Sequence, residues 1–148
     1  GFVDRYRPRV IVTFPEDGMN FHPDHVAVSL AVTRAVVGGN CPCVEKLYYV
    51  LSDALRAGGR RPSVVVDAKP VWAVKAEALR AHESQRLAVL RHFGSLDVCA
   101  EHRRYESFVL RWERGTDWPE RAETSLLDGL AGIAYRPPLY RFPSAHIQ

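Results

Sequence analysis

Short apolar runs and longer amphipathic stretches alternate along the chain, which is typical of an α/β protein. Four runs rich in valine, tyrosine and leucine predict strands, at residues 9–14, 44–51, 63–67 and 105–112. Two stretches with a broad apolar face, each opening on a proline and closing at a glycine, predict helices at 23–37 and 70–93. A helix end at 2–6, a polar connection at 52–62 and a short helix at 125–130 complete the pattern. We expect a Rossmann-like, three-layer α/β/α architecture.

The junction between the first strand and the first long helix carries the strongest candidate chemistry, Phe21-His22-Pro23-Asp24-His25. Pro23 suits the first helical position, which places His22 at the N-cap and projects His22 and His25 toward one side. Asp24 then lies in the first turn, where the helix dipole favours a carboxylate that could orient a histidine. Ligands of open α/β sheets bind beyond the carboxyl ends of strands, so a metal site is one interpretation. The other is a plain helix cap with a surface histidine.

The amino-acid composition argues against several classes of function. The 148 residues carry 20 basic and 17 acidic side chains, a formal charge of +3, and the two signs are largely interspersed. Such a distribution creates no strong electrostatic field that would attract nucleic acid or a membrane surface. The Arg60-Arg61 and Arg103-Arg104 pairs are interpreted as solvated charges. Three cysteines without disulfide or zinc-ribbon spacing indicate reduced thiols in a cytoplasmic protein. No run of eighteen apolar residues is present, so no membrane span is predicted.

Three segments, taken together, carry a family resemblance. Residues 7–14, the following loop, His22-Pro23-Asp24-His25 and the apolar helix resemble the second motif of the LmbE-like (PIG-L) family of metal-dependent de-N-acetylases. This family includes the N-acetylglucosaminyl-phosphatidylinositol de-N-acetylases. Residues 75–85, which end in His82-Glu83-Ser84-Gln85, look like a later family helix, and Glu106-Ser107-Phe108 is similar to its Glu-x-Phe strand. The three segments occur in the family's order.

The resemblance implies a zinc-dependent hydrolase, with another divalent metal as an option, that removes an acetyl group from a small N-acetylated substrate of the N-acetylglucosamine type. His25 would be a metal ligand, and His22, oriented by Asp24, would be catalytic and stabilise the oxyanion. Asn20, on the loop before the motif, and His82 are candidate substrate contacts. A homo-oligomer is compatible with the sequence.

Family members also carry an Ala-His-Pro-Asp-Asp-Glu type segment, which supplies two further ligands and the general base. This sequence contains none. We therefore expect residues 1–148 to be the carboxyl-terminal part of a single deacetylase domain. The competing hypothesis is a non-catalytic α/β binding module, a truncated or degenerate relative without a complete metal site. For His82 the alternative to a substrate contact is a packed residue of an amphipathic helix.

Overall fold

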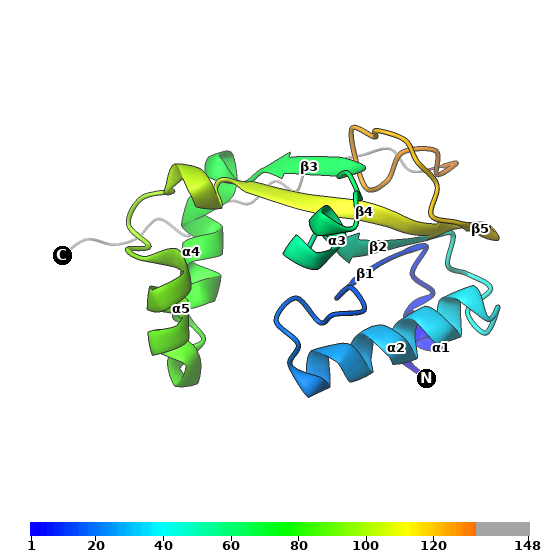
Figure 1. The fold of residues 1–148 in the computed structure, drawn as a ribbon, viewed down its shortest axis with the longest axis horizontal. Helices are drawn as coiled ribbons and strands as arrows, with labels where there is room; N and C mark the ends of the chain where they lie inside the picture. The colour runs from blue at the N-terminus through cyan, green and yellow to red at the C-terminus, as the bar shows by residue number, and fades with distance from the viewer. Residues whose placement is uncertain (133–148) are drawn as a thin grey trace.

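A single mixed β-sheet organises the computed structural model, which describes residues 1–132 (Figure 1). Its strands are β1 (Val10–Thr13), β2 (Lys46–Val50), β3 (Val64–Asp67), β4 (Tyr105–Glu113) and the short β5 (Thr116–Asp117). The order is β1-β2-β4-β3, with β5 paired to β4. The first two strands are parallel, whereas β4 is antiparallel to both β2 and β3. The four predicted strands and the α/β class are confirmed.

Helices precede and follow the strands. They are α1 (Phe2–Tyr6), α2 (Pro23–Val37), α3 (Asp53–Ala57), α4 (Trp72–Arg80) and α5 (Arg86–Phe93). Short 3-10 turns are η1 (Lys69–Val71), η2 (Glu83–Gln85) and η3 (Glu101–Arg103). The predicted bounds of α2 are confirmed, including Pro23 in the first turn and the end at Gly38. α3 lies within the predicted polar connection, and residues 125–130 form turns instead of a helix.

The prediction of a single helix at 70–93 is wrong, because the helix is interrupted between α4 and α5. Ala81 ends α4, and His82 leaves the helical region of backbone space with φ −81° and ψ 63°. The break lets α5 fold back on α4, so that Val89 and Phe93 pack near Trp72 and bury a small separate core. The two helices stand side by side at one end of the sheet (Figure 1).

Alternation along β2 divides the main core between the two faces of the sheet. Leu47 and Tyr49 are fully buried against Val36 of α2, whereas Tyr48 points to the opposite face. There it packs near Leu126, which belongs to the irregular segment 118–132. Within the described residues this segment, rather than a second helical layer, contacts the face of Tyr48. The three-layer arrangement is therefore not confirmed.

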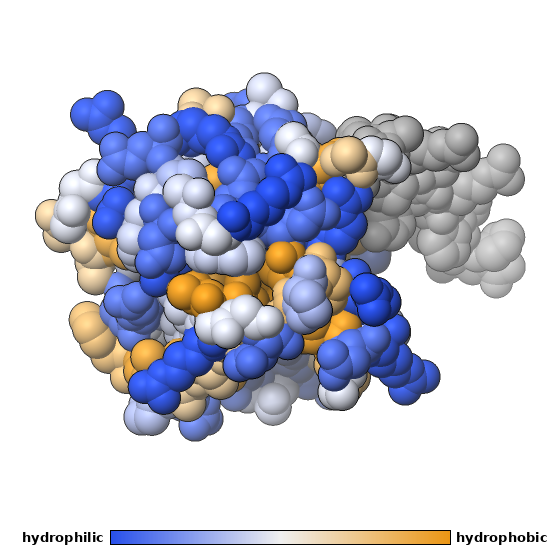
Figure 2. All heavy atoms as spheres, turned by 90° about the vertical axis from the view of Figure 1, so that its right-hand side faces the viewer, coloured by the Kyte–Doolittle hydropathy of each residue, from blue (hydrophilic) through white to orange (hydrophobic). Residues whose placement is uncertain are grey.

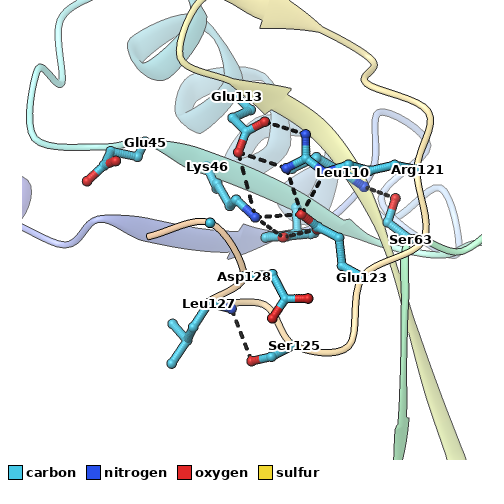
Figure 3. Close-up of polar contacts among 12 residues, drawn as sticks. Glu45, Lys46, Ser63, Leu110, Glu113, Arg121, Glu123, Ser125, Leu127 and Asp128 are labelled. Carbon is cyan, nitrogen blue, oxygen red and sulfur yellow. Dashed lines mark hydrogen bonds and ion pairs between the residues drawn. The ribbon is translucent and has the colours of Figure 1, made fainter. Parts of the chain in front are cut away.

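A buried ionic cluster fastens that segment to the sheet (Figure 3). The side chain of Lys46 is fully buried; its Nζ lies 2.6 Å from a carboxylate oxygen of Glu123 and 3.7 Å from one of Glu113. The Tyr48 hydroxyl donates to Glu123, and Arg121 bridges Glu113 and Glu123. Two cations face two carboxylates, so the cluster is charge-balanced, as a buried group of ions must be to persist. Burial and the bond to Glu123 raise the pKa of Tyr48.

Charges of opposite sign are paired on the surface as well. Viewed from the right-hand side of Figure 1, hydrophilic side chains surround a central band of apolar ones (Figure 2). Glu45, just before β2, contacts both Arg9 and Arg114.

Cys41, Cys43 and Cys99 are free thiols. No helix among residues 1–132 has both the length and the apolar character that crossing a bilayer requires.

Candidate functional site

The loop between β1 and α2 is held in shape by its own polar groups. The backbone N–H of Gly18 donates to the carbonyl of Pro15 at 2.8 Å, which closes a turn. The Asp17 carboxylate accepts from the backbone N–H of Met19 at 2.7 Å and from the Ser52 hydroxyl at 2.6 Å. Ser52 lies two residues beyond the end of β2, so Asp17 ties the loop to the sheet edge where β1 and β2 finish.

Gly18 leaves room for the His25 imidazole. Its φ of +63° favours glycine, and an added Cβ would lie 2.9 Å from the Cβ of His25 and 3.0 Å from the backbone nitrogen of Val26. The Gly18 carbonyl oxygen is 3.0 Å from His25 Nδ1. Because a carbonyl oxygen only accepts, Nδ1 is the donor, and Nε2 of the neutral ring carries a lone pair. Phe14 stacks on the same ring at 4.1 Å and 6°.

His22 has the opposite arrangement of proton and lone pair. Its Nδ1 accepts from the backbone N–H of Asp24 at 3.2 Å and so caps α2. A backbone N–H only donates, so Nδ1 carries no proton and the proton of the neutral ring is on Nε2. The rings of His22 and His25 lie 5.0 Å apart, tilted by 39°. One imidazole thus offers an Nε2 lone pair and its neighbour an Nε2–H.

Main-chain and amide groups, rather than a carboxylate, hold His22. The Asp24 side chain is 87% exposed and its Oδ2 lies 3.9 Å from His22 Nδ1, beyond hydrogen-bond distance. On the other side, Asn20 Oδ1 accepts from the backbone N–H of His22 at 3.1 Å. The structure therefore brings Asn20, His22, Asp24 and His25 together around the start of α2.

His82 stands apart from this group. It is exposed at the break between α4 and η2, and no hydrogen bond or ring contact joins it to the 14–25 loop in the described part of the chain. The anchoring roles of Phe14, Asp17 and Gly18 were not predicted. Their only signal in the sequence is the Pro15-Glu16-Asp17-Gly18 segment. It predicts a turn but not the residues that the turn contacts.

The described residues do not form a metal site by themselves. Across residues 1–132, no group of three or more histidine, cysteine, aspartate or glutamate side chains is gathered in a way that could hold an ion. The chemistry of His25 nevertheless suits a ligand, because its Nδ1–H is fixed by a carbonyl and its Nε2 has no hydrogen-bond partner among residues 1–132. Metal-binding histidines are usually oriented in this way. His22, with Nε2 as a donor, suits a hydrogen bond to a substrate oxygen.

Two known proteins that are similar to this chain carry the same name, and no family-level model matches the sequence. A protein of Mycolicibacterium vanbaalenii named 1D-myo-inositol 2-acetamido-2-deoxy-alpha-D-glucopyranoside deacetylase is 32% identical over 160 residues, covering 87% of this chain and 56% of that protein. A protein of the same name from Rhodococcus jostii is 33% identical over 113 residues, 53% of this chain and 39% of its own length. The chain spans 56% or less of each relative's length.

Proposed function

Because the chain belongs to the LmbE-like (PIG-L) family of de-N-acetylases, we propose that its protein hydrolyses the acetamide of a small N-acetylated glycoside. Water adds to the acetyl carbon, the C–N bond breaks, and acetate and a free amine leave. The observation that carries the proposal is the pair of imidazoles at the start of α2, one with a lone pair and one with an N–H.

His25 would hold a zinc ion through Nε2. The carbonyl of Gly18 and the ring of Phe14 fix the imidazole before the ion binds, so little side-chain freedom is lost on binding. When bound, zinc supplies Lewis-acid chemistry that polarises a carbonyl and acidifies water. The remaining ligands and the general base would come from outside the described residues, as would any second helical layer of the domain.

His22 would stabilise the negative charge that develops on the acetyl oxygen. Its Nε2–H is a preorganised donor, because two hydrogen bonds fix the residue. The His22 ring accepts at Nδ1 from the backbone N–H of Asp24, and the His22 backbone N–H donates to Asn20 Oδ1. A donor aimed at developing charge typically contributes about 10²–10³ in kcat. Asp24 contributes through its backbone N–H, and its exposed carboxylate is free to complement the helix dipole.

The test uses the full-length protein and two readouts, zinc per molecule and amine release from an N-acetylglucosamine-containing glycoside. His25→Ala should lose zinc and activity together. His22→Ala should keep zinc and lower kcat by about 10²–10³ with a smaller change in KM. His82→Ala is the comparison for metal content and should keep zinc whether or not His82 meets substrate.

Two results would contradict the proposal. Full activity of His22→Ala with zinc bound would remove the assigned role of His22. A full-length protein that neither holds zinc nor releases amine would support the competing hypothesis, a non-catalytic α/β module.

A further inference from the structure

A pocket opens at the edge of the sheet where the candidate site lies. It has a volume of about 360 Å³, and Met19 of the 14–25 loop is part of its wall. Val50 and Leu51, at the end of β2, form its floor together with strand β4. The remaining wall comes from α3, α4, α5 and η3, so six elements beyond the loop converge on this pocket.

Basic side chains dominate the polar lining of this pocket. Its titratable residues are Arg56, Lys75, His92, His102, Arg103, Tyr105 and Glu106. The single carboxylate, Glu106, is bound by Lys75 at 2.5 Å. Within residues 1–132, neither Arg56 nor Arg103 has a carboxylate within ion-pair distance. Two guanidinium charges therefore face the pocket without compensation.

Arg103 is the most informative of these residues. Its Nη1 lies 2.8 Å from His92 Nε2, and because a guanidinium only donates, His92 accepts and is neutral. Burial and the charges of Arg103 and Lys75 lower the pKa of His92, which agrees with that state. Phe93 lies 5.6 Å from the guanidinium carbon. The Nε–H of Arg103 is buried without a hydrogen-bond partner in the described part of the chain, an arrangement that costs free energy unless something accepts the bond.

We propose that this pocket is an anion subsite that receives a phosphate or carboxylate group of the substrate. Two uncompensated arginines, of which Arg103 is held by an imidazole and an aromatic ring, suit a multidentate oxyanion, which arginine binds better than lysine does. The pocket and the 14–25 loop lie at the same edge of the sheet. We therefore infer that an anionic group bound in the pocket and an acetamide bound beside the loop belong to one substrate molecule. The inference rests on the proposed function for its substrate, whereas anion binding itself can be measured without any turnover.

Titration of inorganic phosphate and of acetate into the full-length protein tests the subsite directly. We expect saturable binding, weakened about tenfold or more by Arg103→Met and by Arg56→Met, since each removes a charge-assisted hydrogen bond. Arg91→Met is the matched control: it removes the same charge from exposed α5, one residue from His92 but outside the pocket. Tighter binding of phosphate than of acetate assigns a phosphorylated substrate, and the reverse order assigns a carboxylate.

A turnover measurement separates this inference from the proposed function. With an anionic glycoside Arg103→Met should raise KM, while a neutral glycoside should be processed unchanged. Saturable, arginine-dependent phosphate binding without amine release would keep the subsite and overturn the deacetylase. Absence of saturable binding by both anions, or equal weakening by Arg91→Met and both pocket variants, would overturn the subsite.

Discussion

The two histidines differ in which ring nitrogen carries the proton, because different backbone atoms lie beside them. Their spacing and the cap position of His22 could be predicted, because Pro23 fixes where the helix starts. Their tautomers could not, since these depend on the Gly18 carbonyl and the Asp24 N–H. The sequence pointed to the Asp24 carboxylate as the orienting group, and the observed group is the main chain of the same residue.

Gly18→Ala should destabilise the protein for two reasons, an unfavourable φ and a collision with His25. Gly59→Ala is a matched control, because Gly59 has a φ of +83° and no atom within 4 Å of an added Cβ. The control should lose about 1–2 kcal/mol from the left-handed backbone alone. Gly18→Ala should lose about 1–3 kcal/mol more from overpacking. Urea denaturation of both variants measures the difference; equal losses would mean that the loop relaxes away from His25.

Among the elements, α2 was predictable to the residue and the α4–α5 pair was not. α2 carries both boundary signals, a proline at its start and a glycine at its end. Residues 70–93 keep a helical apolar pattern throughout, and the break at 81–85 follows from packing of Phe93 near Trp72, a contact between positions distant in sequence. Periodicity reports neighbours along the chain and cannot report such a contact.

The end of β3 should make stability sensitive to acid. Arg104 binds Asp67 through two bonds, at 2.7 and 2.9 Å, and with the backbone N–H of Lys69 lowers the pKa of that carboxyl from 3.8 to about 2. The ionised form is favoured by folding, so this stabilisation is present above pH 3.8 and is lost as the pH falls toward about 2. Melting temperature should fall over that window.

Asp67→Asn should be less stable than the wild type at neutral pH and should show a smaller fall in melting temperature on acidification. Asp53→Asn is the control, because Asp53 is exposed in the first turn of α3 and forms no ion pair in the described part of the chain. Parallel curves for Asp67→Asn and wild type would assign the acid sensitivity to other carboxylates, such as Glu113, whose pKa Arg121 lowers.

At the scale of the whole molecule, pairing across long sequence distances sets the sheet order and the covering of its second face. The antiparallel insertion of β4 between β2 and β3 was not predicted, because strand direction depends on the path of the whole 68–104 connection. The cluster of Lys46 and Glu123 was equally hidden, since its members lie 77 residues apart. A lysine in an apolar strand gives no signal of its distant partner.

Lys46→Met should destabilise the fold by about 3–5 kcal/mol, because it leaves buried carboxylates uncompensated. Adding Glu123→Gln leaves Arg121 facing Glu113, a balanced pair, so the double variant should lose less than the sum of the single losses. Arg80→Met, which breaks an exposed pair with Asp97, should cost at most about 1 kcal/mol. Urea denaturation of the four variants measures the coupling, and strict additivity would contradict a cooperative cluster.

The dependence of both imidazoles on main-chain atoms also has an evolutionary consequence. A carbonyl and an N–H are present whatever side chain a residue carries, so descendants of this sequence can change the exposed side chains of Met19 and Phe21 while keeping the same proton arrangement. Both positions have a positive φ, which limits the accessible replacements. Replacements at these two positions therefore change the rim of the candidate site while the proton arrangement of its two imidazoles is inherited unchanged.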